Sequence, residues 1–118
     1  MTQSCDITKP LNKKHCVPCE GGIPALPIEK IKAHLSALSD WQLNAKNNSI
    51  SRVLHFKDFY ETMAYVNAIA WISHQENHHP DLTISYNRCA IHYMTHAVHG
   101  LTENDFICAA KVDALLKN

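Results

Sequence analysis

The chain lacks an excess of charge, a hydrophobic run long enough to cross a bilayer, and any internal repeat. Its 11 basic and 11 acidic residues balance over 118 positions, so no net field draws it to nucleic acid or to an anionic membrane. No apolar stretch approaches the roughly 20 residues of a membrane span, and the N-terminus has no apolar run typical of a signal peptide. These absences predict one globular domain in the cytoplasm, with no direct nucleic-acid partner and no membrane.

A complete disulfide framework is also missing, because the five cysteines form an odd set. We therefore expect reduced thiols. Residues 1–26 contain Cys16 and Cys19 in a Cys-x-x-Cys pattern, are interrupted by three prolines and two glycines, and show no periodicity. We predict an irregular N-terminal arm over residues 1–26 and a folded domain over residues 27–118. A zinc site built on the Cys-x-x-Cys pattern and nearby ligands remains an alternative.

Hydrophobic periodicity predicts three helices and four strands. The helices are expected over residues 27–38, 59–79 and 102–116, and the strands over residues 41–45, 50–56, 82–86 and 89–96. Asp58 is the expected N-cap of the central helix, and Thr102 with Asp105 resembles a capping box. Short connections make both strand pairs hairpins, so the order is α-β-β-α-β-β-α. We predict an α+β fold, with a four-stranded antiparallel sheet and helices packed on one face.

The central helix carries an apolar stripe that suits a helix lying on a sheet. Its expected members are Phe59, Met63, Val66, Ile69, Ala70 and Ser73.

Four histidines are the most informative residues. His74, His78 and His79 precede Pro80, and His96 follows sixteen residues after the proline. Imidazole both gives and takes protons near neutral pH, so the cluster indicates acid–base chemistry or a metal site. A helix end and a strand end could direct such rings at one ligand. Rings with different pKa values could protonate a leaving hydroxyl and remove another proton, which is typical of a dehydratase.

Two other interpretations compete with acid–base chemistry. His74 and His78 have the spacing of a His-Glu-x-x-His zinc helix, but position 75 is Gln and the glutamate is Glu76. The base of a metalloprotease is therefore absent. A zinc site of another kind would need His96 as a third ligand. Alternatively, histidines at a helix end merely favour the negative pole of the helix dipole, which explains one ring better than the whole set.

Several segments match one known family in order. They are His74-x-x-x-His78-His79-Pro80, Tyr86-Asn87-Arg88, Thr95-His96, Gly100-Leu101-Thr102, Asp105, and His55-Phe56-Lys57-Asp58-Phe59 before the central helix. Together they resemble the pterin-4a-carbinolamine dehydratases, over about Cys16 to Lys111. The segment Cys16 to Leu26 is similar to the arm of bacterial members. The resemblance implies the same α-β-β-α-β-β-α fold.

The resemblance also implies an activity: dehydration of 4a-hydroxytetrahydrobiopterin to quinonoid dihydropterin, which recycles the cofactor of aromatic amino-acid hydroxylases. It implies His78, His79 and His96 as the active-site histidines, with no metal and no organic cofactor. We expect His78 and His96 to be the acid–base pair and His79 to hold the pterin. Substrate contacts are expected at His74, Pro80, Leu82, Thr95 and Asp105, although Asp105 fits a helix cap better than a catalytic acid.

The resemblance further implies a homodimer or homotetramer and a functional link to an aromatic amino-acid hydroxylase. His74 stands where many members have a glutamate, and Leu82 replaces an aromatic residue found in some of them. The alternatives to the enzyme are a non-catalytic pterin-binding protein or transcriptional co-regulator, and a role in molybdopterin metabolism.

Overall fold

The computed structural model describes residues 10–18 and 24–116. Its elements follow the predicted order. After the 3-10 turn η2 (Leu11–Lys13) come helix α1 (Ile28–Leu35), strands β1 (Gln42–Leu43) and β2 (Ile50–His55), helix α2 (Phe59–Glu76), strands β3 (Asp81–Ser85) and β4 (Arg88–Tyr93), the 3-10 turn η3 (His96–Val98) and helix α3 (Glu103–Leu115). The predicted α+β fold is confirmed.

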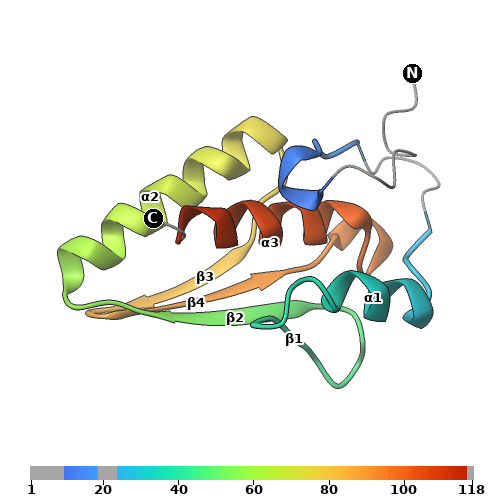
Figure 1. Ribbon diagram of the computed structural model, residues 1–118, viewed down its shortest axis with the longest axis horizontal. Helices are drawn as coiled ribbons and strands as arrows, with labels where there is room; N and C mark the ends of the chain where they lie inside the picture. The colour runs from blue at the N-terminus through green and yellow to red at the C-terminus, as the bar shows by residue number, and fades with distance from the viewer. Residues whose placement is uncertain (1–9, 19–23, 117–118) are drawn as a thin grey trace.

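The four strands form one antiparallel sheet in the order β1-β2-β4-β3. Helices α2 and α3 lie across the same face of the sheet, and α1 sits beside the first turns of α3 (Figure 1). The central strand β4 shows why one face is covered: Cys89, Ile91 and Tyr93 are fully buried, whereas Arg88 and His92 are exposed on the other face. Alternation in the sequence therefore decides which face the helices cover.

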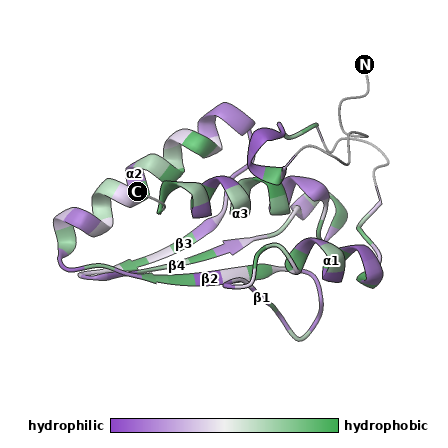
Figure 2. Ribbon diagram, in the orientation of Figure 1, coloured by the Kyte–Doolittle hydropathy of each residue, from purple (hydrophilic) through white to green (hydrophobic). Residues whose placement is uncertain are grey.

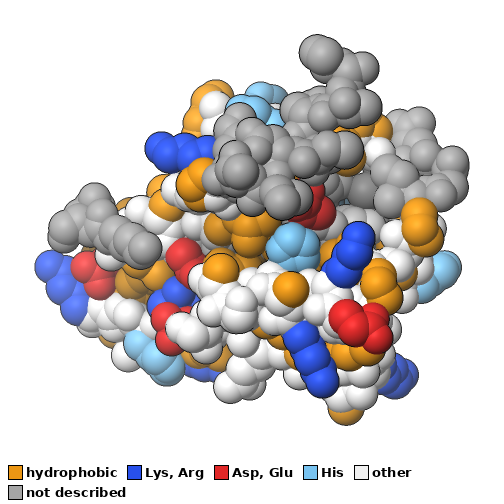
Figure 3. All heavy atoms as spheres, turned by 45° about the vertical axis from the view of Figure 1, so that its right-hand side comes forward, with side chains coloured by type: hydrophobic (Ala, Val, Ile, Leu, Met, Phe, Trp, Pro, Cys, Tyr) orange, Lys and Arg blue, Asp and Glu red, His pale blue; other side chains and the backbone are white. Residues whose placement is uncertain are grey.

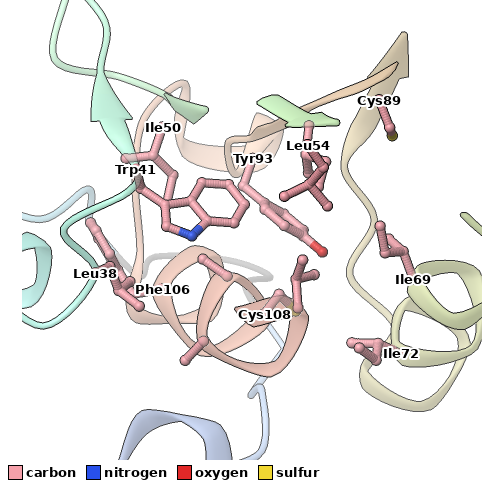
Figure 4. Close-up of a cluster of buried hydrophobic side chains, with 14 of the residues drawn as sticks. Leu38, Trp41, Ile50, Leu54, Ile69, Ile72, Cys89, Tyr93, Phe106 and Cys108 are labelled. Atoms are coloured by element: carbon pink, nitrogen blue, oxygen red, sulfur yellow. The ribbon is translucent and has the colours of Figure 1, made fainter. Parts of the chain in front are cut away.

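The core lies between the sheet and the two long helices. Tyr93 and Phe106 are its largest fully buried side chains, and Trp41, Ile69 and Cys108 pack around them (Figure 4). The C-terminal end of α2 is hydrophilic by contrast (Figure 2). That end leads directly into the segment that carries His78 and His79.

The start of α2 agrees with the sequence, but the buried face of this helix differs from the prediction. Asp58 caps the helix, because its Oδ1 accepts from the Glu61 amide at 2.8 Å. The predicted stripe is confirmed at Val66 and Ile69, which are buried, and is wrong at Phe59, which is 45 % exposed. The Thr62 hydroxyl donates to the Tyr86 carbonyl at 3.0 Å, and this contact turns Thr62 inward against the β3–β4 turn. The buried residues of α2 are Thr62, Val66, Ile69, Ile72 and Glu76.

Two boundaries near the histidines also differ from the prediction. Helix α2 ends at Glu76, because Asn77 adopts the left-handed conformation (φ 52°, ψ 42°). His78 thus follows the helix, so His74 and His78 do not share a helical face, although their spacing is that of a zinc-binding helix. Strand β4 ends at Tyr93, and His96 begins η3 rather than ending a strand. Thr95 pairs instead with Gly100 in an isolated bridge, so the chain turns back between them.

The described part of the arm, residues 10–18, contains η2 and otherwise no helix or strand. It lies along α3 and meets the C-terminal end of α2 (Figure 1). Cys5 and Cys19, and with them half of the Cys-x-x-Cys pattern, lie outside the described residues.

Charged side chains of both signs are scattered over the face seen in Figure 3, and no patch of one sign dominates it. This distribution agrees with the balanced composition. Within residues 10–18 and 24–116, no helix combines the length and the hydropathy needed to cross a membrane.

Candidate active site

Asp105 is the centre of a buried hydrogen-bond network at the start of α3. Its side chain is fully buried, and its Oδ1 lies 2.7 Å from Nε2 of His78. Its Oδ2 accepts from the Thr95 hydroxyl at 2.7 Å and from the Thr102 amide at 3.0 Å. A carboxylate oxygen accepts hydrogen bonds, so this contact fits the His78 tautomer in which Nε2–H donates to Asp105 Oδ1.

The same carboxylate caps α3. Thr102 and Asp105 form the predicted capping box, and the Thr95 and Thr102 hydroxyls lie 2.9 Å apart. Both threonines are only 4 % exposed. The capping prediction for Asp105 is confirmed, and the contact with His78 adds a role that a cap alone does not have.

Tyr93 forms an apolar wall beside His78. The two rings are nearly parallel, with an interplanar angle of 8° and centroids 6.0 Å apart. Burial raises the pKa of the Tyr93 hydroxyl, and the nearby Cys108, Cys16 and Asp105 raise it further. This hydroxyl points to the side of Cys108 (Figure 4) and has no hydrogen-bond partner among the described residues. The ring face of Tyr93 therefore lies beside the His78 imidazole, while Asp105 holds Nε2 at the edge of that imidazole.

His79 and His96 form an exposed pair of rings. Their ring centroids are 6.4 Å apart at an interplanar angle of 25°, and both residues are exposed. His78 is more enclosed, since its side chain is 12 % exposed. One chain segment after α2 supplies His78 and His79, and the turn after β4 supplies His96. The fold thus brings His79 close to His96, and Asp105 holds His78, the residue before His79.

The expected substrate contacts lie in three places. Thr95 and Asp105 belong to the buried network, in which Asp105 contacts both His78 and Thr95. Pro80 and Leu82 are half-buried next to the histidine segment, with Leu82 paired to Ile91 on the covered face of the sheet. His74 is exposed on α2, and its ring lies 5.4 Å from that of Trp71.

No sequence pattern predicted a functional role for Tyr93. The alternation of Cys89, Ile91 and Tyr93 places it on the covered face. Nothing in that pattern indicates that the turn after α2 brings His78 against the ring of Tyr93.

Glu76 supports the site from the end of α2. It is 9 % exposed and accepts from the Cys16 amide at 2.7 Å, with His15 Nδ1 at 2.9 Å and Lys111 Nζ at 3.7 Å. Burial alone would raise the pKa of Glu76, but the Cys16 amide, His15 and Lys111 outweigh it and hold the pKa below its usual value. The arm, α2 and α3 thus meet two residues before His78.

The described residues contain no group of three or more His, Cys, Asp or Glu side chains placed to hold a metal ion. A surface hollow of about 490 Å³ lies between the arm, the α1–β1 connection and α3. None of the expected site residues lines it. The hollow is therefore separate from the histidine site.

The fold and site define a small α+β protein in which an exposed histidine pair stands beside a histidine oriented by a buried aspartate. A family model described as pterin 4 alpha carbinolamine dehydratase matches residues 24–115. The chain belongs to this family. The resemblance found in the sequence is thereby confirmed.

Relatives of similar length carry the same family name. The Nitrosomonas europaea protein named "Putative pterin-4-alpha-carbinolamine dehydratase" is 54% identical over 119 residues and covers 100% of both chains. A protein of that name from Legionella pneumophila is 57% identical over 111 residues, covering 93% of this chain and 98% of its own.

Two solved structures have a similar fold. One, described as a transcriptional coactivator/pterin dehydratase from Brucella melitensis, gives a TM-score of 0.74 at 31% identity, covering 77% of this chain and 97% of its own. The other is described as a pterin dehydratase-like protein that is a RuBisCO assembly factor in the alpha-carboxysome. It gives a TM-score of 0.58 at 22% identity, over 67% of this chain and 92% of its own. This second likeness shows the fold alone.

Proposed function

We propose that this protein dehydrates 4a-hydroxytetrahydrobiopterin to quinonoid dihydropterin and so recycles the pterin cofactor of aromatic amino-acid hydroxylases. The observation that carries the proposal is the contact of 2.7 Å between His78 Nε2 and Asp105 Oδ1, next to the exposed His79–His96 pair. Family membership supports the substrate class. The reaction is that of a hydro-lyase.

The dehydration needs one proton delivered and one removed. The C4a–O bond breaks, the hydroxyl leaves as water after it is protonated, and the proton on ring N5 is lost. These two transfers balance, so no oxidant or reductant takes part. Two imidazoles with different surroundings can perform both transfers near neutral pH.

His78 is suited to be the base. Because Nε2–H donates to Asp105, Nδ1 is free to accept the proton from N5. The Asp105 carboxylate then stabilises the imidazolium that forms, as carboxylates do for catalytic histidines elsewhere. The Tyr93 ring limits rotation of the imidazole. Asp105 and Tyr93 are therefore positioning residues.

His96 is suited to deliver the proton to the leaving hydroxyl. It is exposed at the start of η3, so solvent can reprotonate it between turnovers. The rings of His79 and His96 are close to parallel, so both can contact the same flat ligand. We assign His79 to holding the pterin, together with Pro80 and Leu82 at the edge of the site.

A stopped-flow assay of carbinolamine dehydration tests the proposal. The wild type should exceed the uncatalysed rate, and His78→Ala and His96→Ala should each lose about 100-fold or more, the size of a general acid or base contribution. His55→Ala is the matched control, because His55 is an exposed histidine on the uncovered face of β2 and should keep the wild-type rate. A wild type that is no faster than the uncatalysed reaction would remove the enzyme proposal.

A pterin-binding co-regulator is the second candidate, since the Brucella melitensis relative is described as both coactivator and dehydratase. Pterin binding without turnover would favour this candidate. A molybdopterin substrate would instead give turnover with that pterin and none with the carbinolamine.

We also propose that the protein is a homodimer or homotetramer. Strand β3 is the last strand of the sheet, and its outer edge pairs with no other described strand. Tyr60 and Trp71 of α2 are 81 % and 59 % exposed. Unpaired edges and exposed aromatic side chains are typical of contact surfaces between subunits. Light scattering coupled to gel filtration measures the mass, and a strictly monomeric mass of 13.3 kDa would contradict this proposal.

A further inference from the structure

Two thiols that lie far apart in the sequence meet between the arm and α3. The Sγ atoms of Cys16 and Cys108 are 3.6 Å apart across a separation of 92 residues. Cys108 is fully buried, whereas Cys16 is half-buried. Two sulfur atoms in a disulfide lie about 2.05 Å apart, so closure needs an approach of only about 1.5 Å.

The backbone around Cys16 is held in place by two helices. The Cys16 amide donates to Glu76 of α2 at 2.7 Å. The neighbouring Val17 exchanges two hydrogen bonds with the Asn104 side chain, at 3.0 and 2.6 Å. Lys14 forms an ion pair with Glu103 at 2.9 Å. The sulfur contact is therefore a fixed feature of the docked arm.

We propose that Cys16 and Cys108 form a thiol–disulfide exchange site, which a low-molecular-weight disulfide oxidises so that the arm becomes covalently bonded to α3. The Cys16 sulfur first attacks the small disulfide and releases one small thiol, leaving a mixed disulfide on the arm. The Cys108 sulfur then attacks the Cys16 sulfur and releases the second small thiol. Two protein thiols are oxidised, one small disulfide is reduced, and the two protons leave on the small thiols.

The surroundings of the pair set the rate of exchange. The hydrogen bond with Cys108, together with burial, raises the pKa of the Cys16 thiol. Only a thiolate attacks a disulfide, so exchange on the docked arm is slow, and the expected reduced thiols persist without such an oxidant. The Cys16–Cys108 disulfide, called the latch below, therefore forms slowly and persists once formed, unlike the disulfide of a rapid redox sensor.

The latch would close a loop from residue 16 to residue 108, which spans most of the chain. A cross-link that closes so long a loop restricts the unfolded state strongly. Cys108 also lies one helical turn after Asp105, on the same side of α3. The oxidised protein should therefore be more stable and should keep its arm docked beside the histidine site.

The test uses the full chain incubated under native conditions with oxidised glutathione over hours. Intact mass and peptide mapping should show a Cys16–Cys108 cross-linked peptide, a loss of about 2 Da, and a rise in Tm of at least about 5 °C that dithiothreitol reverses. Cys108→Ser should instead accumulate glutathione on Cys16. Cys89→Ser is the matched control, because Cys89 is a buried cysteine on β4 and its removal should leave the cross-link intact.

Two results would overturn the latch. One is a Cys16 that pairs only with another cysteine of the arm. The other is a stable mixed disulfide on Cys16 while Cys108 remains a free thiol. If Cys108→Ser fails to fold, Cys16→Ser replaces it in the test. In Cys16→Ser, both the cross-link and the rise in Tm on oxidation must be absent. None of these readouts depends on dehydratase activity.

Discussion

Nε2 of His78 lies 2.7 Å from Oδ1 of Asp105, across 27 residues of sequence. This contact joins the segment after α2 to the first turn of α3. The same aspartate caps α3 and accepts from Thr95. The orientation of His78, the proposed base, therefore depends on a correctly folded first turn of α3.

Asp105→Asn should slow dehydration by about 10- to 100-fold, because the amide no longer stabilises a charged His78 ring. It should also lower the free energy of unfolding by about 1–3 kcal/mol, since a buried charge-assisted network is weakened. Stopped-flow rates and urea denaturation measure the two effects.

Asp113→Asn is the matched control for that variant. Asp113 is the aspartate of α3 that accepts from Trp41 Nε1 at 2.9 Å and from Arg52 at 2.6 Å, among residues that include none of the site histidines. This variant should lose stability and keep its rate. Equal slowing in both variants would show that Asp105 acts through general stability alone.

His79→Ala and His96→Ala should separate stability from function. Both side chains are exposed and lie against each other, so their removal should change the free energy of unfolding by no more than about 0.5 kcal/mol. His96→Ala should chiefly lower kcat, and His79→Ala should chiefly raise KM. A KM effect confined to His96→Ala would reverse the two assignments.

Glu76→Gln should make the stability less dependent on pH in the acid range. The pKa of Glu76 is held below its ordinary value of 4.5 in the folded state, so its stabilising contribution is complete above that value and is lost as the pH falls through the lowered pKa. The wild type should exceed the variant by a constant margin above about pH 5, and the margin should shrink below it. Urea denaturation from pH 3 to pH 7 measures the margin, and a margin that does not change with pH would contradict the assignment.

Tyr93→Phe should leave activity unchanged and should not destabilise the protein. The hydroxyl is buried without a hydrogen-bond partner among the residues described, so its removal costs nothing and can add up to about 1 kcal/mol. Tyr93→Ala should cost about 3–5 kcal/mol and should also slow the reaction, because His78 loses its wall. A slow but stable Tyr93→Phe would show that the hydroxyl itself takes part in the reaction.

The sequence by itself determined the order of the elements and the caps at Asp58 and Thr102. Each depends on neighbours a few residues away, through alternation, capping chemistry or turn residues, so local physical chemistry suffices. The ordered histidine motif also determined the family, because it is a pattern of residue types and spacing.

Only the tertiary structure decided how the site is assembled. The left-handed Asn77 ends α2 before His78, so His74 and His78 do not lie on one helix. The chain turns at Thr95, so His96 lies outside strand β4. The contacts of His78 with Asp105 and of Cys16 with Cys108 join residues 27 and 92 positions apart. No local pattern encodes such contacts, because they exist only once α2, α3 and the arm pack together on one face of the sheet.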